Sequence, residues 1–136
     1  MIIADTSALI AYFDAADPAH GRVAAIIEAE RAPIVVPPLV CAEVDHLVSR
    51  RVGAHAARQV LAELTSGAYA IAEFGADDLK DAAAVLDRYA DRRLGLVDAT
   101  IVVLAERLRG AAVATLDRRD FDGLVRADGT PVALLP

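Results

Sequence analysis

Residues 1–7, Met-Ile-Ile-Ala-Asp-Thr-Ser, decide the fold of this chain. The first four residues are apolar and lead directly into Asp5, Thr6 and Ser7, whose side chains accept hydrogen bonds from the free amides at a helix start. A short apolar run that stops at such a cap is typical of a buried strand that meets a helix. The stretch therefore predicts a strand over 1–4 and a helix over 8–13.

Short apolar runs and helical patterns alternate along the rest of the chain. We expect further strands at 34–36, 69–74, 111–116 and 131–135, the last at a sheet edge. We expect helices over about 22–32, 39–51, between Gly53 and Gly67, and over about 77–90, 97–110 and 119–124. This alternation indicates a three-layer α/β/α sandwich with a mainly parallel central sheet, in a single domain over 1–136.

Composition and the chain start favour a cytoplasmic protein. Hydrophobic residues make up 56% of the 136 residues, which is ample for a core. No apolar run approaches the ~18 residues of a membrane span, so no membrane partner is expected. The start has no positively charged region of the kind a signal peptide carries, and the lone Cys41 can form no internal disulfide.

The charge pattern is acidic overall, with the positive charge concentrated in arginine. The net charge of -6 argues against a simple basic nucleic-acid coat. Of the 14 cationic residues all but Lys80 are Arg, and pairs stand at 50–51, 92–93 and 118–119. The guanidinium fork suits phosphate, although a GC-rich coding bias also accounts for an Arg excess.

Four carboxylates far apart in sequence are expected at one edge of the sheet. Asp5 and Asp117 each follow an apolar strand, and in open α/β sheets ligands bind outside the carboxyl ends of the strands. Glu43 comes one turn after Pro38, and Asp98 opens an apolar helix. Each one also has a simpler explanation as a helix-terminal, turn or solvated acid.

A divalent cation is the natural partner of such a cluster. Glu43 and Asp98 stand in apolar sequence, and buried carboxylates need a partner. No interior Lys is available, and the Arg residues lie at element ends. Mg²⁺ prefers hard oxygen ligands and keeps several waters, so a few carboxylates suffice. A Mg²⁺ ion held in this way serves phosphoryl transfer.

The motifs together resemble a known family. Asp5-Thr6-Ser7-Ala8-Leu9 after the first strand, Glu43, Asp98-Ala99 at a helix start, and Thr115-Leu116-Asp117 with Asp120-Phe121 are similar to those of PIN-domain ribonucleases. The chain length further resembles VapC, the toxin of type II toxin–antitoxin pairs. The resemblance spans nearly the whole chain and implies a PIN-like fold.

The resemblance also implies roles for particular residues. The family's acidic quartet falls on Asp5, Glu43, Asp98 and Asp117, with Asp5 and Asp98 the most direct ligands of Mg²⁺, for which Mn²⁺ would substitute. Its orienting hydroxyl positions fall on Thr6, Ser7 and Thr115. The implied partners are structured RNA such as tRNA or rRNA, a cognate antitoxin and a second copy in a homodimer. We expect Arg92, Arg93, Arg118 and Arg119 to hold RNA phosphates beside the site.

Other functions stay open at the level of sequence. A phosphoacceptor signalling domain also gathers acids around Mg²⁺, but it usually has a Lys after a late strand, where this chain has Thr115-Leu116-Asp117. A non-catalytic Mg²⁺-binding module would keep the same acids. A haloacid-type phosphatase would carry a second Asp where this chain has Ser7. Glu43 and His46 share the Glu-x-x-His spacing of di-iron bundles, but only one copy is present.

Overall fold

The computed structural model describes residues 1–136 and contains one five-stranded sheet in which every pairing of neighbouring strands is parallel. The strand order is β3-β2-β1-β4-β5. The strands are β1 (Ile2–Ala4), β2 (Ile34–Val36), β3 (Tyr69–Ile71), β4 (Ala112–Ala114) and β5 (Leu134–Leu135). β1 is central, and the chain adds strands on both of its sides, as in other doubly wound α/β sheets.

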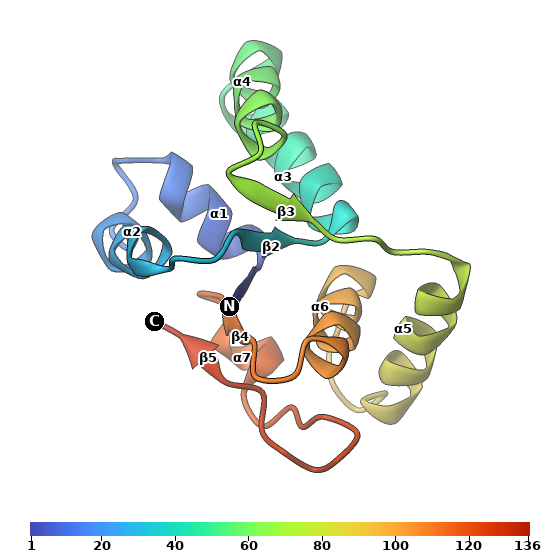
Figure 1. The fold of residues 1–136 in the computed structure, drawn as a ribbon. Helices are drawn as coiled ribbons and strands as arrows, with labels where there is room; N and C mark the ends of the chain where they lie inside the picture. Colours follow the sequence, from blue (N-terminus) through green and yellow to red (C-terminus); the bar gives the residue numbers. More distant parts are fainter.

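Helices cover both faces of the sheet (Figure 1). They are α1 (Thr6–Phe13), α2 (His20–Ala29), α3 (Pro38–Arg51), α4 (Ala54–Leu64), α5 (Ala76–Arg88), α6 (Leu96–Arg107) and α7 (Arg118–Phe121). The pair α1 and α2 lies on one side, the pair α5 and α6 lies on the other, and α3 packs with α4 near the β3 edge. The predicted three-layer arrangement is thereby confirmed.

Two helices begin two residues earlier than the sequence pattern predicts. The first was expected from residue 8 and starts at Thr6, because the extended backbone of Asp5 (φ -87°, ψ 161°) occupies the cap position. The second was expected from residue 22 and starts at His20. The strands at residues 69–74, 111–116 and 131–135 are shorter than expected, since only three, three and two residues enter the ladder.

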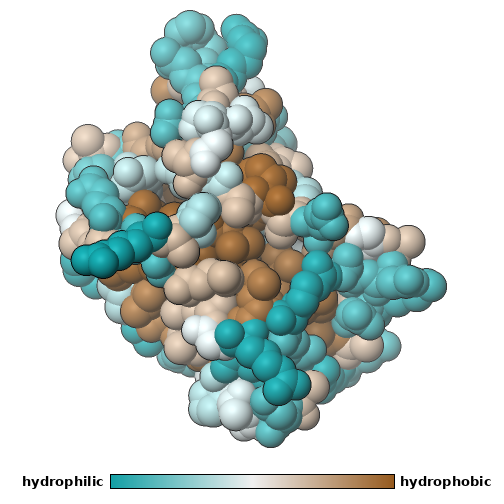
Figure 2. Space-filling model, viewed as in Figure 1, coloured by the Kyte–Doolittle hydropathy of each residue, from teal (hydrophilic) through white to brown (hydrophobic).

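The core is one continuous cluster of 29 buried hydrophobic residues. Its densest part is α6, where every residue from Ala99 to Ala105 is buried. Figure 2 shows hydrophobic residues at the middle of the molecule, over the sheet, with hydrophilic residues toward α4 and α5. Burial on all sides fixes α6 against the sheet. The side chain of Asp98, in the first turn of α6, is therefore held in a defined place.

The register of β1 and β4 brings two polar residues together. Ile2 pairs with Ala112, and Ala4 pairs with Ala114. The amide of Asp5 then donates to the carbonyl oxygen of Ala114 at 2.9 Å. Asp5 and Thr115 therefore leave the sheet side by side at its carboxyl edge.

Arg126 joins the segment after α7 to this frame through three hydrogen bonds. The guanidinium of Arg126 donates to the carbonyl oxygens of Ala105 (3.0 Å), Ala111 (2.8 Å) and Pro131 (2.7 Å). These bonds join the end of α6, the start of β4 and the loop before β5.

None of the helices has the combined length and apolar character that crossing a membrane requires.

Candidate active site

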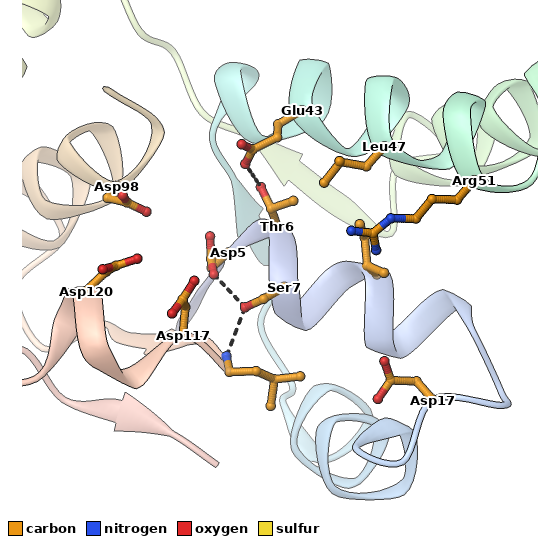
Figure 3. A pocket seen from close by; sticks show the side chains of 12 residues that line it. Asp5, Thr6, Ser7, Asp17, Glu43, Leu47, Arg51, Asp98, Asp117 and Asp120 are labelled. Atoms are coloured by element: carbon orange, nitrogen blue, oxygen red, sulfur yellow. Dashed lines mark hydrogen bonds between the residues drawn. The ribbon is translucent and has the colours of Figure 1, made fainter. Parts of the chain in front are cut away.

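A cavity of about 440 Å³ opens at the carboxyl edge of the sheet (Figure 3). All four carboxylates of the expected quartet line it, together with Thr6 and Ser7. The full lining is Asp5, Thr6, Ser7, Ile10, Asp17, Glu43, Leu47, Arg51, Asp98, Leu116, Asp117 and Asp120. Residues separated by up to 115 positions are thus collected by the ends of β1 and β4 and the starts of α3 and α6.

Asp5 is the most buried and most firmly held acid of the cavity. Only 5% of it is exposed. Its Oδ2 atom accepts hydrogen bonds from the Ser7 hydroxyl (2.7 Å) and the Thr115 hydroxyl (2.8 Å). Because both donors use one oxygen, Oδ1 is left for another ligand. The cap position of Asp5 is not used for capping, since the side chain makes no bond to a helix amide.

The two hydroxyls that hold Asp5 are themselves held in place. Ser7 Oγ accepts from the backbone amide of Leu116 at 2.9 Å, and Thr115 Oγ1 accepts from the amide of Asp117 at 3.0 Å. The loop after β4 is therefore bonded to the first turn of α1. Thr115 is buried behind Asp5 and does not line the cavity, so it acts through Asp5.

Glu43 is oriented by the neighbouring hydroxyl. Thr6 Oγ1 donates to Glu43 Oε2 at 2.5 Å, across 37 residues of sequence. This bond joins the start of α1 to the second turn of α3 and points the carboxylate into the cavity (Figure 3).

Asp98 caps a helix, although its surroundings disfavour the ionised form of its carboxyl group. Its Oδ2 accepts from the Gly95 amide at 2.8 Å, so it caps the start of α6. The pKa of Asp98 is nevertheless raised to about 6. Burial is the largest cause, and the charges of Asp5, Asp120 and Glu43 add to it, while the bond from Gly95 acts in the opposite direction.

Asp117 directly precedes α7, and Asp120 lies on its single turn. Asp117 is exposed at the cavity mouth and Asp120 is half-buried. Burial and the nearby charge of Asp117 raise the pKa of Asp120. Asp120 is therefore a fifth acid beside the quartet, whereas the sequence indicates it only as part of the Asp120-Phe121 motif.

The sequence overestimated how deeply two of the acids are buried. Glu43 and Asp98 stand in apolar sequence, but both are half-buried, because helix periodicity turns the apolar neighbours to the core and the acids to the cavity. Asp5 alone among the carboxylates is buried. The shortage of neutralising cations was predicted correctly, with the exception of Arg51, which lines the cavity.

None of the arginines expected to hold phosphates lines the cavity: Arg92, Arg93, Arg118 and Arg119. Arg92 donates to the carbonyl oxygen of Asp122 at 2.6 Å, and its guanidinium lies over the ring of Tyr89. Arg118 donates to the carbonyl oxygen of Pro136. Both side chains thus have contacts within the protein, and a role of the four in RNA binding stays a prediction.

Two further charged residues of the lining, Asp17 and Arg51, were not expected at the site from the sequence. Arg51 follows Glu43 and Leu47 at steps of four residues, so one face of α3 carries all three into the cavity. That spacing was visible in the sequence. Asp17 comes from the loop between α1 and α2, where no periodicity indicates direction.

The donor set of the cavity fits a hard divalent cation. Its charged groups are carboxylates, with Arg51 as the exception, and both burial and the charges of the neighbouring acids raise the pKa of Asp98. As the side chains stand, no three of the acidic, His or Cys residues are close enough together to hold one ion. Mg²⁺ is typically bound by one or two carboxylates plus waters, and Asp5 Oδ1 is available for this.

The match to known families is extensive. A profile of the family described as the PIN domain matches residues 2–126. The chain belongs to the PIN-domain family. A curated relative, ribonuclease VapC26 from Mycobacterium tuberculosis, is 45% identical over 135 residues, which cover 99% of this chain and 100% of the relative. The resemblance to PIN-domain nucleases of the VapC type, noted in the sequence, is confirmed.

Solved structures agree with this assignment. The crystal structure of M. tuberculosis VapC20, a toxin that cleaves the sarcin–ricin loop, is 27% identical, with a TM-score of 0.73 over 79% of this chain and 82% of that one. A toxin–antitoxin complex from Klebsiella pneumoniae is 21% identical, with a TM-score of 0.68 over 91% and 92%. The second likeness concerns the PIN fold alone.

The phosphoacceptor alternative loses its remaining support in this PIN domain. The chain has one lysine, Lys80, and this side chain pairs with Asp77 on the exposed surface of α5. No lysine lines the cavity.

Proposed function

We propose that this PIN-domain protein is a Mg²⁺-dependent endoribonuclease that acts as the toxin of a toxin–antitoxin pair in the cytoplasm. The observation that carries the proposal is the meeting of Asp5, Glu43, Asp98 and Asp117 around one cavity. The substrate is structured RNA, such as tRNA or rRNA. A cognate antitoxin completes the proposal, supported by the similar PIN fold that was solved in a toxin–antitoxin complex. A homodimer belongs to the same proposal.

Each residue of the cavity has a separate part in this function. Asp5 and Asp98 would hold Mg²⁺ most directly, with Glu43 and Asp117 completing the acidic set; Mn²⁺ suits the same oxygen ligands. When bound, such an ion supplies Lewis-acid chemistry, lowering the pKa of water and stabilising charge on a phosphoryl group.

The hydroxyl groups act on the carboxylates. Ser7 and Thr115 fix Asp5 through Oδ2, which turns Oδ1 to the cavity, and Thr6 fixes Glu43. These bonds settle the carboxylate orientations before RNA arrives, so little reorganisation is needed during the reaction. A bound divalent ion would offset the negative charge of the carboxylates, so the cavity could accept a phosphodiester that it would otherwise repel.

Cleavage of bulk tRNA and ribosomal RNA tests the proposal. We expect discrete fragments with Mg²⁺, none with EDTA, and recovery when Mg²⁺ is restored in excess. Mapping fragment ends by primer extension then identifies the preferred RNA. Cleavage that continues unchanged in EDTA contradicts the metal requirement, and intact RNA under every metal condition contradicts the ribonuclease.

A further inference from the structure

One positively charged side chain, that of Arg51, lines the acidic cavity. Of the charged residues in its lining, six are acids, namely Asp5, Asp17, Glu43, Asp98, Asp117 and Asp120, and the seventh is Arg51. Figure 3 shows the Arg51 guanidinium directed across α1, well separated from the group formed by Asp5, Asp98, Asp117 and Asp120. The cavity thus has an end formed by acids alone and an opposite end that holds Arg51 together with Asp17.

The face of α3 sets the spacing between the two ends. Glu43, Leu47 and Arg51 succeed one another at intervals of four residues and all line the cavity. At a rise of ~1.5 Å per residue, the backbone positions of Glu43 and Arg51 are about 12 Å apart. A guanidinium displaced in this way from the carboxylates does not compete with a metal ion for their oxygens.

The guanidinium of Arg51 is free to take a ligand. Arg51 is exposed and belongs to none of the ion pairs of the structure, even though Asp17 lines the same end of the cavity. It also stands where the acidic cavity adjoins a second, apolar cavity of about 290 Å³, since Arg51 and Ile10 line both.

We infer that Arg51 forms a phosphate-binding subsite, which takes a backbone phosphate of the RNA next to the one that is cut. This inference rests on the proposed ribonuclease function. The planar fork of Arg matches two oxygens of a phosphate. Such a contact fixes the position of the strand without reading its sequence.

The adjacent Arg50 provides a matched control. Both residues are in the last turn of α3, where a cation is favoured by the helix dipole whatever its other role. Arg50 is exposed but does not line the cavity. Arg50→Ala removes the same charge from the same helix end, so any difference from Arg51→Ala comes from the cavity.

The test measures binding of a fluorescein-labelled single-stranded RNA of mixed sequence by anisotropy, with Ca²⁺ in place of Mg²⁺, over a range of salt. We expect Arg51→Ala to bind about tenfold more weakly and to lower the salt slope by about 0.7, the value for one phosphate contact on a single strand. Arg50→Ala should match the wild type, and Arg51→Lys should recover part of the affinity.

A neutral phosphate analogue locates the contact. With single methylphosphonate substitutions along the RNA, one position should weaken the wild type as much as Arg51→Ala does, and should cost the Arg51→Ala variant nothing further. Equal behaviour of Arg51→Ala and Arg50→Ala, while RNA is still cut in Mg²⁺, overturns the subsite alone. If the wild type does not bind the labelled RNA but still cuts tRNA or ribosomal RNA, the subsite alone is overturned. If the wild type cuts no RNA under any metal condition, the proposed function is overturned and the subsite with it.

Discussion

Replacing Asp5 by Asn is expected to lower the rate of RNA cleavage at least about a thousandfold while the fold is retained. The change removes the negative charge of the one buried carboxylate in the cavity. The amide oxygen of Asn can still accept from Ser7 and Thr115, so the hydrogen bonds at the end of β1 survive. Initial rates in Mg²⁺ and circular dichroism of the same preparations measure the two effects.

The exposed Asp45 on α3 supplies the control for this change. Asp45→Asn removes an equal charge two residues from Glu43 but outside the cavity, and it should cleave RNA at the wild-type rate. If Asp5→Asn keeps a tenth or more of the wild-type rate, the carboxylate is not a metal ligand of the reaction.

An Asp98→Asn variant is expected to be more stable than the wild type at pH 7.5 in EDTA, although it no longer cleaves RNA. The pKa of Asp98 is about 6 in the folded protein, against about 3.9 for an unperturbed Asp in the unfolded chain. The folded state therefore holds the proton more tightly, and the free energy of unfolding falls as pH rises between these values. Asn carries no charge and escapes this loss.

Thermal unfolding at two pH values measures how much of the stability difference between the variant and the wild type depends on the charge of Asp98. In EDTA, Asp98→Asn should melt a few degrees above the wild type at pH 7.5 and close to it near pH 4, where the wild-type carboxyl is protonated as well. Mg²⁺ should raise the melting temperature of the wild type at pH 7.5 and leave the variant unchanged. A variant that melts lower at pH 7.5 than the wild type in EDTA contradicts the repulsion among the acids.

The sequence predicted those parts of the site that follow from strand ends and helix starts. Asp5 and Asp117 come directly after β1 and β4, and parallel strands deliver such residues to one edge. Asp98 begins α6, whose apolar sequence leaves no position but the interior. The bounds of the short strands and their order along the sheet were harder to predict from the sequence. In a three-residue strand, the residues that form sheet hydrogen bonds are determined by the neighbouring strands.

The remaining parts of the site depend on how elements face one another. The directions of Asp17 and Asp120 follow from a loop and from a single helical turn, which carry too few residues for a periodic signal. Arg92 was expected at the site because it is paired in sequence with Arg93. Its place over the Tyr89 ring depends on the packing of the segment after α5 against the C-terminal loop.

The central claim is that these carboxylates gather in order to share a divalent cation. Crystals grown with Mn²⁺ at pH 7.5 test it most directly, because anomalous scattering locates the ion without reference to activity. We expect a peak in the acidic cavity with Asp5 Oδ1 and an oxygen of Asp98 among the ligands of the ion. A cavity without bound metal at millimolar Mn²⁺, or Mn²⁺ found only at surface acids such as Asp77, contradicts it.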